Sequence, residues 1–169
     1  MLEETAAGRC VGCHDADFFV WTVEWPAMDL TAFVDDLVYE PTQTDSPGVD
    51  LTVDSISRIT EPGRVDFGGG ELDPAETDPV ETAKRDPEDD YGWWDLSAGV
   101  YLIEYNETLS VPDDVRLVCQ TRAAVRARGA FHPTLHLDGE ATLEPVPLSV
   151  GPGGIEIKEN ARLSTLLAE

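Results

Sequence analysis

Three arginines stand close together in the sequence, and they are the side chains best suited to hold an anion. Arg122, Arg126 and Arg128 occupy a seven-residue stretch of a chain with 11 basic and 34 acidic residues, a formal net charge of −23. A guanidinium group holds carboxylate or phosphate oxygens through paired N–H donors. The cluster predicts either a site for an anionic ligand or a set of ion pairs that neutralise acidic neighbours between subunits.

A second group of residues has the chemistry to bind a metal ion. Cys10 and Cys13 stand in a Cys-x-x-Cys-His sequence that ends at His14. With His14, or with His132 and His136, the two thiolates would make a tetrahedral zinc site, although this is only half of the usual paired pattern. The alternatives are covalent haem attachment, which requires export, and reduced thiols in an unligated tail. Three cysteines do not form a disulfide framework.

The acidic composition restricts the partners and the habitat of the protein. A charge of −23 repels phosphate backbones and anionic membranes, so neither nucleic acid nor a membrane is expected as a partner. Abundant Asp and Glu with two lysines are typical of halophilic proteins, because a Debye length of about 3 Å at 1 M salt weakens self-repulsion. The sequence shows no run of roughly 18 apolar residues and starts with acidic residues, unlike a signal peptide. A cytoplasmic protein with an acidic surface is therefore expected.

The elements that must position these residues are predicted to be mainly short strands. A short extended run over residues 18–25 precedes a helix that is expected to start after the N-cap Asp29, use residues 30–38 for one face, and end at Pro41. Apolar runs punctuated by Gly, Pro and Asp then predict strands. The predicted strands are Val49–Val53, Gly99–Tyr105, Val115–Cys119, Thr134–Leu137, Ala141–Glu144, Gly154–Ile157 and Arg162–Leu167. Their spacing is typical of a β-sandwich, jelly roll or barrel.

Residues 68–92 have little to bury and predict an exposed acidic excursion rather than a domain boundary. The expected organisation is an N-terminal extension, residues 1–28, followed by one β domain, residues 29–169, which contains this excursion. Trp93 and Trp94, just beyond it, are expected to serve in packing or at an interface.

Five segments of the sequence, taken in order, form a family pattern. They are Gly48-Val-Asp-Leu51, Leu96-Ser-Ala-Gly99, Leu109-Ser-Val-Pro-Asp-Asp114, Thr121-Arg-Ala-Ala-Val-Arg126 and Glu159-Asn-Ala-Arg-Leu-Ser-Thr-Leu166. Their order and spacing resemble the dCTP deaminase and dUTPase superfamily over residues 30–169. The resemblance implies a mainly β, distorted jelly roll (β-clip) of the dUTPase-like type with a short N-terminal helix. It also implies a homotrimer with nucleotide sites between subunits and a deoxyribonucleoside triphosphate held through Mg²⁺.

The resemblance assigns phosphate binding to the arginine cluster. Arg122 falls on the arginine of the family's Arg-Ser-Ser motif, whereas Ala123 and Ala124 replace both serines. A hydrogen bond to a charged phosphate contributes about 1.5–3 kcal/mol, so the loss of two hydroxyls calls for other donors. Arg126 and Arg128 are the expected substitutes, each one residue out of register with the family's next arginine.

The resemblance also assigns catalytic roles to two carboxylates. Asp138 matches the family's turn aspartate, and Glu144 matches the glutamate that moves protons in metal-free deamination in the deaminase branch. The closing motif keeps Arg162 but has Thr165 where the family usually has glutamine. Asp50, in the opening strand, is expected to serve backbone hydrogen bonding.

The expected function is hydrolytic deamination of dCTP to dUTP, because a helix before the Val-Asp-Leu strand resembles the deaminase branch. Hydrolysis of dUTP on the same scaffold, with Asp138 prominent, is the first alternative. The second alternative is a catalytically inactive trimer that keeps the fold for binding a nucleotide or a partner, and the replacements Ala123, Ala124 and Thr165 suggest it.

Overall fold

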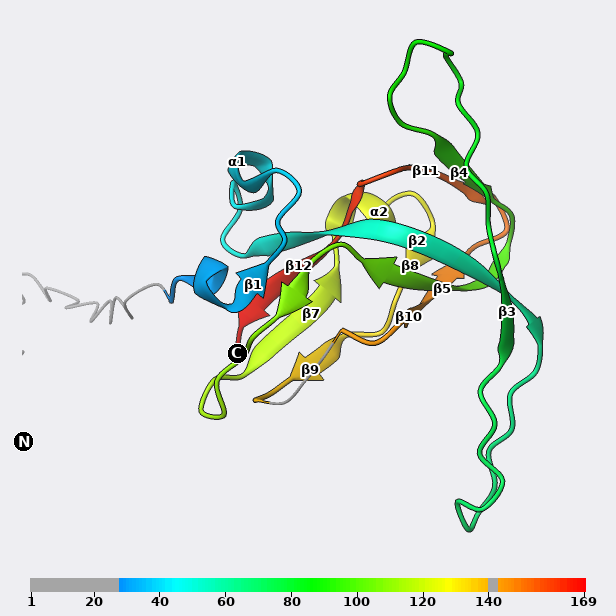
Figure 1. Ribbon diagram of the computed structural model, residues 1–169, viewed down its shortest axis with the longest axis horizontal. Helices are drawn as coiled ribbons and strands as arrows, with labels where there is room; N and C mark the ends of the chain where they lie inside the picture. The colour runs from blue at the N-terminus through cyan, green and yellow to red at the C-terminus, as the bar shows by residue number, and fades with distance from the viewer. Residues whose placement is uncertain (1–27, 140–142) are drawn as a thin grey trace, which may run out of the picture.

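Strands make up most of the secondary structure in the computed structural model, which describes residues 28–139 and 143–169 (Figure 1). Three helical segments of four residues each interrupt them: η1 (Leu30–Phe33), α1 (Glu40–Gln43) and α2 (Ala123–Arg126). The strands are β1 (Val34–Asp35), β2 (Val49–Glu61), β3 (Glu76–Pro79), β4 (Trp93–Leu96), β5 (Gly99–Tyr105), β6 (Thr108–Leu109), β7 (Leu117–Thr121), β8 (Ala130–Phe131), β9 (Leu135–Leu137), β10 (Val146–Val150), β11 (Ile155–Lys158) and β12 (Arg162–Ala168). The prediction of a mainly β protein is confirmed.

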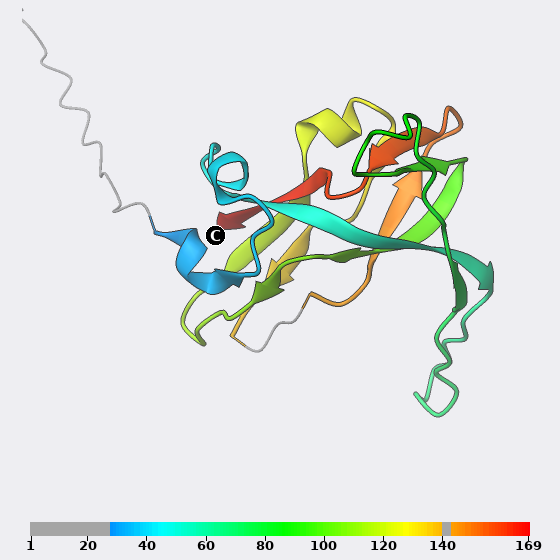
Figure 2. The ribbon, with the colours of Figure 1, turned by 45° about the horizontal axis from the view of Figure 1, so that its top comes forward.

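One antiparallel sheet forms the body of the protein. Its strands follow the order β8-β10-β5-β2-β12-β7-β9, and β3 pairs with β2 beside that path. The sheet twists strongly, and the 13-residue β2 runs across most of its length (Figure 2). Two smaller antiparallel pairs, β1 with β6 and β11 with β4, stand apart from it. Strand β12 lies between β2 and β7, and the site described below is built on these three strands.

Two apolar clusters lie on the inner face of the sheet. Strand β5 shows how the alternation builds them, since Tyr101 and Ile103 are buried whereas Val100 is exposed and Leu102 is half-buried. The first cluster includes Ile56, Trp94, Leu96, Tyr101, Ile103 and Leu148. The second includes Leu30, Val49, Leu51, Leu117 and Leu166. Each fully buried side chain of this size stabilises the fold by about 1.5–3 kcal/mol.

The predicted helix over residues 30–41 is wrong beyond its first turn. Asp29 is the N-cap, as predicted, and its Oδ1 accepts from the Thr31 N–H at 3.1 Å. The 3₁₀ turn η1 ends at Phe33, because Val34 then pairs with Leu109 on β6 and Asp36 takes a left-handed φ of 62°. A strand partner far along the chain thus overrides the local helical spacing.

Pro41 lies inside the first turn of α1 instead of ending a helix. Proline is tolerated there because an N–H at this position has no partner within the helix.

Most predicted strands are confirmed, although their ends shift. Predicted residues 99–105 match β5 at both ends. The next strand begins two residues later than predicted, at Leu117, because the N–H of Val115 closes a turn onto the Pro112 carbonyl at 3.0 Å. The run predicted over 141–144 has its first two residues outside the described part, and residues 143 and 144 lie in no strand.

The strand β10 was not predicted, and its second residue, Pro147, is a type that is rare in central strands. The structure tolerates this proline since β8 pairs with β10 only at Ser149 and Val150, and β5 covers the other edge. Within the described chain, Pro147 therefore has a strand partner on one side only, which is β5.

The acidic excursion contains a strand that its composition does not predict. Residues 76–79 form β3, whose four residues are all exposed and pair with the far end of β2. The two strands make an arm that projects from the body and turns back through residues 62–75 (Figure 1). Phe67 and Val65 are almost fully exposed on this turn. Trp94, just beyond the excursion, is buried as predicted, and its Nε1 donates to the Val80 carbonyl at 2.8 Å.

None of the helices within 28–139 and 143–169 is long and apolar enough to span a bilayer.

Candidate functional site

Asp50 is the centre of the most highly organised charged group in the described chain. Its carboxylate is fully buried on β2. Oδ1 accepts from the Thr165 hydroxyl at 2.7 Å, and Oδ2 binds Arg122 Nη2 at 3.0 Å and Arg162 Nη1 at 3.2 Å. A buried charge is tolerated only when it is paired and hydrogen-bonded, and both oxygens meet that condition.

Three neighbouring strands fix this group. Thr165 on β12 lies directly opposite Asp50 on β2. On the other side, Ser164 of β12 pairs with Thr121 at the end of β7, and Arg122 follows that strand. The Arg122 N–H also donates to the Leu163 carbonyl at 2.9 Å. The positions of the two guanidinium groups therefore depend on sheet backbone rather than on loops.

The predicted arginine cluster is divided by the structure. Arg122 faces Asp50, whereas Arg126 donates to the Thr121 carbonyl and Arg128 donates to the Ala124 carbonyl at 2.8 Å. Arg126 is exposed at the end of the short helix α2, and Arg128 is exposed just after it. Ala123 and Ala124 are exposed on the same helix and offer no hydroxyl. The candidate anion site is thus centred on Arg122.

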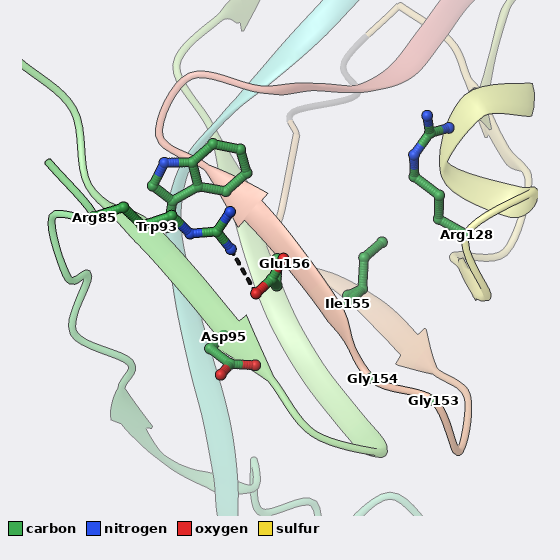
Figure 3. A pocket seen from close by; sticks show the side chains of 8 residues that line it. All are labelled: Arg85, Trp93, Asp95, Arg128, Gly153, Gly154, Ile155 and Glu156. Carbon is green, nitrogen blue, oxygen red and sulfur yellow. Dashed lines mark ion pairs between the residues drawn. The ribbon is translucent and has the colours of Figure 1, made fainter. Parts of the chain in front are cut away.

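A groove of about 590 Å³ lies between the β4–β11 pair and Arg128 (Figure 3). On one wall the Arg85 guanidinium stacks on the Trp93 ring at 4.0 Å and pairs with Glu156 at 2.5 Å. Arg128 stands across the groove from this group (Figure 3). Of the two arginines that line the groove, Arg85 binds Glu156, whereas Arg128 has no carboxylate partner among the described contacts.

Asp138 lies at the other end of β7 from Arg122. It follows β9 at an exposed turn and pairs with Arg116 at 3.5 Å, just before β7 begins. Gly139 packs so closely on the neighbouring turn that a Cβ there would lie 2.5 Å from the Asp113 Cα. Gly139 is therefore held against Asp113, and Asp138 before it is exposed to solvent.

Glu144 is exposed and precedes β10 by two residues. It lines a groove of about 350 Å³ with apolar residues of β9 and β10. The strand β10 itself reads Val-Pro-Leu-Ser-Val and contains no carboxylate. Glu144 therefore precedes β10 and does not lie on a strand, where the resemblance expects the deaminase glutamate.

A buried chain of hydroxyls and an imidazole lies beside the site. His132 Nδ1 lies 2.7 Å from the Pro133 carbonyl, which can only accept, so Nδ1 carries the proton and Nε2 accepts from the Ser164 hydroxyl at 2.7 Å. Tyr105 then donates to Ser164 at 2.5 Å. Burial lowers the pKa of His132, raises the pKa of Tyr105 and raises the pKa of Cys119 to about 11. His132 and Ser164 are buried and Tyr105 is half-buried, so these hydrogen bonds hold β12 in place.

A second buried network attaches α1 to the same region. Gln43 Nε2 donates to the Asp50 carbonyl at 2.9 Å and to Glu107 at 2.7 Å. Glu107 also accepts from the backbone N–H and the hydroxyl of Thr52, at 2.8 and 2.5 Å. Burial raises the pKa of the Glu107 carboxyl against these donors. The network fixes β2 around Asp50.

No group of three or more metal-ligating side chains occurs within 28–139 and 143–169. His132 is committed to Ser164, and exposed His136 pairs with Glu169 at 3.2 Å. Cys10 and Cys13, the zinc candidates, lie outside the described residues. Three of the roughly four lone-pair sites of the Asp50 carboxylate already accept from Thr165 and the two arginines.

Sequence reasoning missed the role of two residues in this site. Asp50 was expected to bond the backbone, and Arg162 was noted only as part of the closing motif. The available signal was a charged residue at an otherwise buried position of the Val-Asp-Leu strand, since a buried carboxylate requires a cationic partner.

Comparisons with known proteins show what this chain resembles. No family model matches the chain. A probable deoxyuridine 5'-triphosphate nucleotidohydrolase of Methanosarcina mazei is 29% identical over 128 residues, which cover 75% of this chain and 71% of the relative. One of the same description from Methanococcoides burtonii is 28% identical over 136 residues, covering 79% and 76%. One from Halobacterium salinarum is 39% identical over 86 residues, about half of each chain.

A solved structure shares the fold. The crystal structure of 2'-deoxycytidine 5'-triphosphate deaminase from Agrobacterium tumefaciens superimposes with a TM-score of 0.52 at 15% identity, over 80% of this chain. This chain spans only 43% of the deaminase chain. The fold is therefore the expected dUTPase-like one, and these relatives and this structure support the resemblance to the dCTP deaminase/dUTPase superfamily.

Proposed function

We propose that the protein binds a deoxypyrimidine nucleoside triphosphate and holds its phosphates at Arg122. The observation that carries this proposal is the guanidinium fixed on the buried Asp50 while 24% of the Arg122 side chain stays exposed. In a chain of charge −23, a fixed and accessible cation is a rare feature. The names of the curated relatives support a nucleotide of this class.

The site is shared between chains of a homotrimer. Asp138 and Arg122 lie at opposite ends of β7, a strand of five residues that spans about 17 Å. One nucleotide that uses the phosphate site and the turn carboxylate must therefore receive them from different copies. The exposed, rigid turn around Gly139 supports this arrangement.

An uncharged sheet face supplies a surface on which copies can meet. Strand register brings Phe131, Ser149 and Val100 into one outward row, and Pro147 and Leu102 into the next. Phe131 and Val100 are 56% and 45% exposed. These five positions carry no acidic residue, although 34 of the 169 residues are acidic, so repulsion between like-charged copies is weak at this patch.

The reaction proposed is hydrolysis of dUTP to dUMP and pyrophosphate. Water attacks the α-phosphorus, the bond to the bridging oxygen of the β-phosphate breaks, and pyrophosphate leaves. Asp138, from the neighbouring copy, takes the proton of the attacking water as general base. Mg²⁺ enters as part of the nucleotide complex, because the carboxylate beside Arg122 is already occupied.

Deamination of dCTP is the second candidate, and it rests on Glu144. The carboxylate would take a proton from water that attacks C4 and return it to the leaving ammonia. Its exposed position before β10 favours the hydrolase over this reaction. Loss of both hydroxyls at Ala123 and Ala124 is what supports the inactive alternative.

Product analysis separates these reactions. Purified protein is incubated with dUTP or dCTP in molar KCl with Mg²⁺, and the products are resolved by ion-exchange chromatography. Release of dUMP that falls about 10- to 100-fold or more in kcat/KM in Arg122→Ala and in Asp138→Asn supports the hydrolase. Arg64→Ala, which removes an arginine that forms an exposed ion pair on the arm, is the control.

Other outcomes identify the alternatives. Formation of dUTP from dCTP that is lost in Glu144→Gln would establish the deaminase. A folded trimer that forms neither product would indicate the catalytically inactive alternative. A nucleotide-dependent rise in its melting temperature would then show binding without turnover.

A further inference from the structure

The two arginines on Asp50 carry more positive charge than the buried carboxylate requires. One guanidinium balances one carboxylate, yet Arg122 and Arg162 bind the same oxygen, Oδ2, at 3.0 and 3.2 Å. Their side chains remain 24% and 29% exposed, whereas Asp50 is completely buried. The exposed side of this group is therefore formed by guanidinium rather than by carboxylate.

Both guanidinium groups keep N–H donors that the protein does not use. Each has five donors. Among the described contacts, Arg122 uses only Nη2, and Arg162 uses only Nη1, which also meets the Thr42 carbonyl and Asp45. Asp45 is 57% exposed, so its contact at 3.3 Å is screened by water and salt and is weak. The remaining donors suit an anion with several oxygens.

The arrangement is rigid enough to act as a receptor. Arg162 and Thr165 belong to β12, Asp50 to β2 and Arg122 to the end of β7, and these are adjacent strands of one sheet. Sites built on strands hold their side chains more accurately than sites on loops, and a shared carboxylate orients both forks together.

We infer that Arg162 is a second phosphate-binding residue, which with Arg122 grips a polyphosphate chain through two guanidinium groups oriented by Asp50. Arg162 touches the ligand directly, and Asp50 is a positioning residue that acts through the two arginines. This inference rests on the proposed function and adds to it a residue on a third strand. It also explains how binding survives the alanines at 123 and 124, because two forks replace the missing hydroxyls.

Calorimetric titration with inorganic tripolyphosphate tests the inference without any turnover. The full chain is used in molar KCl, as wild type, Arg122→Gln, Arg162→Gln and Arg162→Lys, with Arg64→Gln on the arm as control. Arg162→Gln is expected to weaken binding about 10- to 100-fold, as Arg122→Gln does. Arg162→Lys, which keeps the charge but loses the fork, recovers part of the affinity. Arg64→Gln binds like the wild type.

Two results would overturn the inference, and they are distinguishable. If Arg122→Gln loses binding and Arg162→Gln does not, Arg162 only balances charge, and the proposed function stands. If the folded wild type binds neither tripolyphosphate nor dUTP, both fail. Should Arg162→Gln not fold by its melting profile, the lysine variant decides: unchanged affinity for tripolyphosphate contradicts the inference, because a single ammonium cannot replace a bidentate contact.

Discussion

At the scale of single residues, Asp50 decides the electrostatics of the site. Its buried carboxylate accepts a hydroxyl and two guanidinium groups, so it fixes two arginines that water would otherwise leave mobile. The sequence showed the family's arginine at 122 but not this partner, because ion pairing depends on which strands become neighbours. The same limit applies to Arg126 and Arg128, whose carbonyl partners lie within their own turn.

Replacing Asp50 by alanine is expected to cost stability as well as binding. The substitution leaves Arg122 without its carboxylate and Arg162 with only the exposed Asp45, and breaking a buried pair costs about 3–5 kcal/mol. Urea unfolding measures the loss. Asp73→Ala, at an exposed pair with Arg64, is the control and should change the free energy of unfolding by less than about 1 kcal/mol. Equal effects of the two variants would contradict the buried-pair description.

His132 is expected to make stability depend on pH. Burial lowers its pKa in the folded protein, so below the ordinary value of 6.5 the unfolded chain binds more protons than the folded one. The free energy of unfolding should therefore fall as the pH drops below about 6.5, and His132→Gln should flatten this slope. Denaturant titrations between pH 5 and 8 test it, with exposed His136→Gln as control. An unchanged slope in His132→Gln would rule out this role.

At the scale of elements, the turn after β9 places Asp138, the proposed general base. Its glycine packs directly on Asp113, which no local sequence pattern shows. Strands with clear alternation, such as β5, could be predicted to the residue, whereas β3 and β10 could not. Glu76–Pro79 offers only exposed polar residues, and Pro147 is acceptable only because of which strands flank it. Prediction from sequence succeeded where local pattern decides and failed where pairing decides.

The substitution Gly139→Ala is expected to displace this turn. A Cβ would lie 2.4 Å from Asp113 Oδ1 and 2.5 Å from its Cα, so the backbone must shift at a cost of about 1–3 kcal/mol. Hydrolysis of dUTP should fall because Asp138 moves with the turn. Gly153→Ala, where a Cβ meets nothing within 4 Å, is the matched control. Thermal melting and steady-state kinetics on both variants check this, and wild-type behaviour of Gly139→Ala would contradict the packing.

At the scale of the whole molecule, charge and assembly are linked. A chain with formal charge −23 has few surfaces on which a second copy can settle, and the outward face of β8, β10 and β5 is one of them. In the proposed function the site uses a second copy, since Arg122 and Asp138 stand at opposite ends of β7. Neither the face nor this separation is visible in sequence, because both arise from strand register.

A charge placed on that face should prevent assembly. Val100→Glu adds a carboxylate to the 45% exposed valine at its centre, and like charges across three copies oppose the contact. Light scattering after gel filtration in molar KCl should give three times the 18.4 kDa chain mass for the wild type and the single-chain mass for the variant. Val65→Glu, on the arm, is the control and should stay trimeric. A Val100→Glu trimer would exclude this face as the interface.

The most direct test of the central claim is the binding of a non-hydrolysable dUTP, with an imido group between the α- and β-phosphates. Titration calorimetry in molar KCl with Mg²⁺ should show one nucleotide per chain for the wild type and affinity about 10- to 100-fold weaker for Arg122→Ala. Equal affinity in the two proteins, or no binding to a folded wild type, would contradict a phosphate site at Arg122.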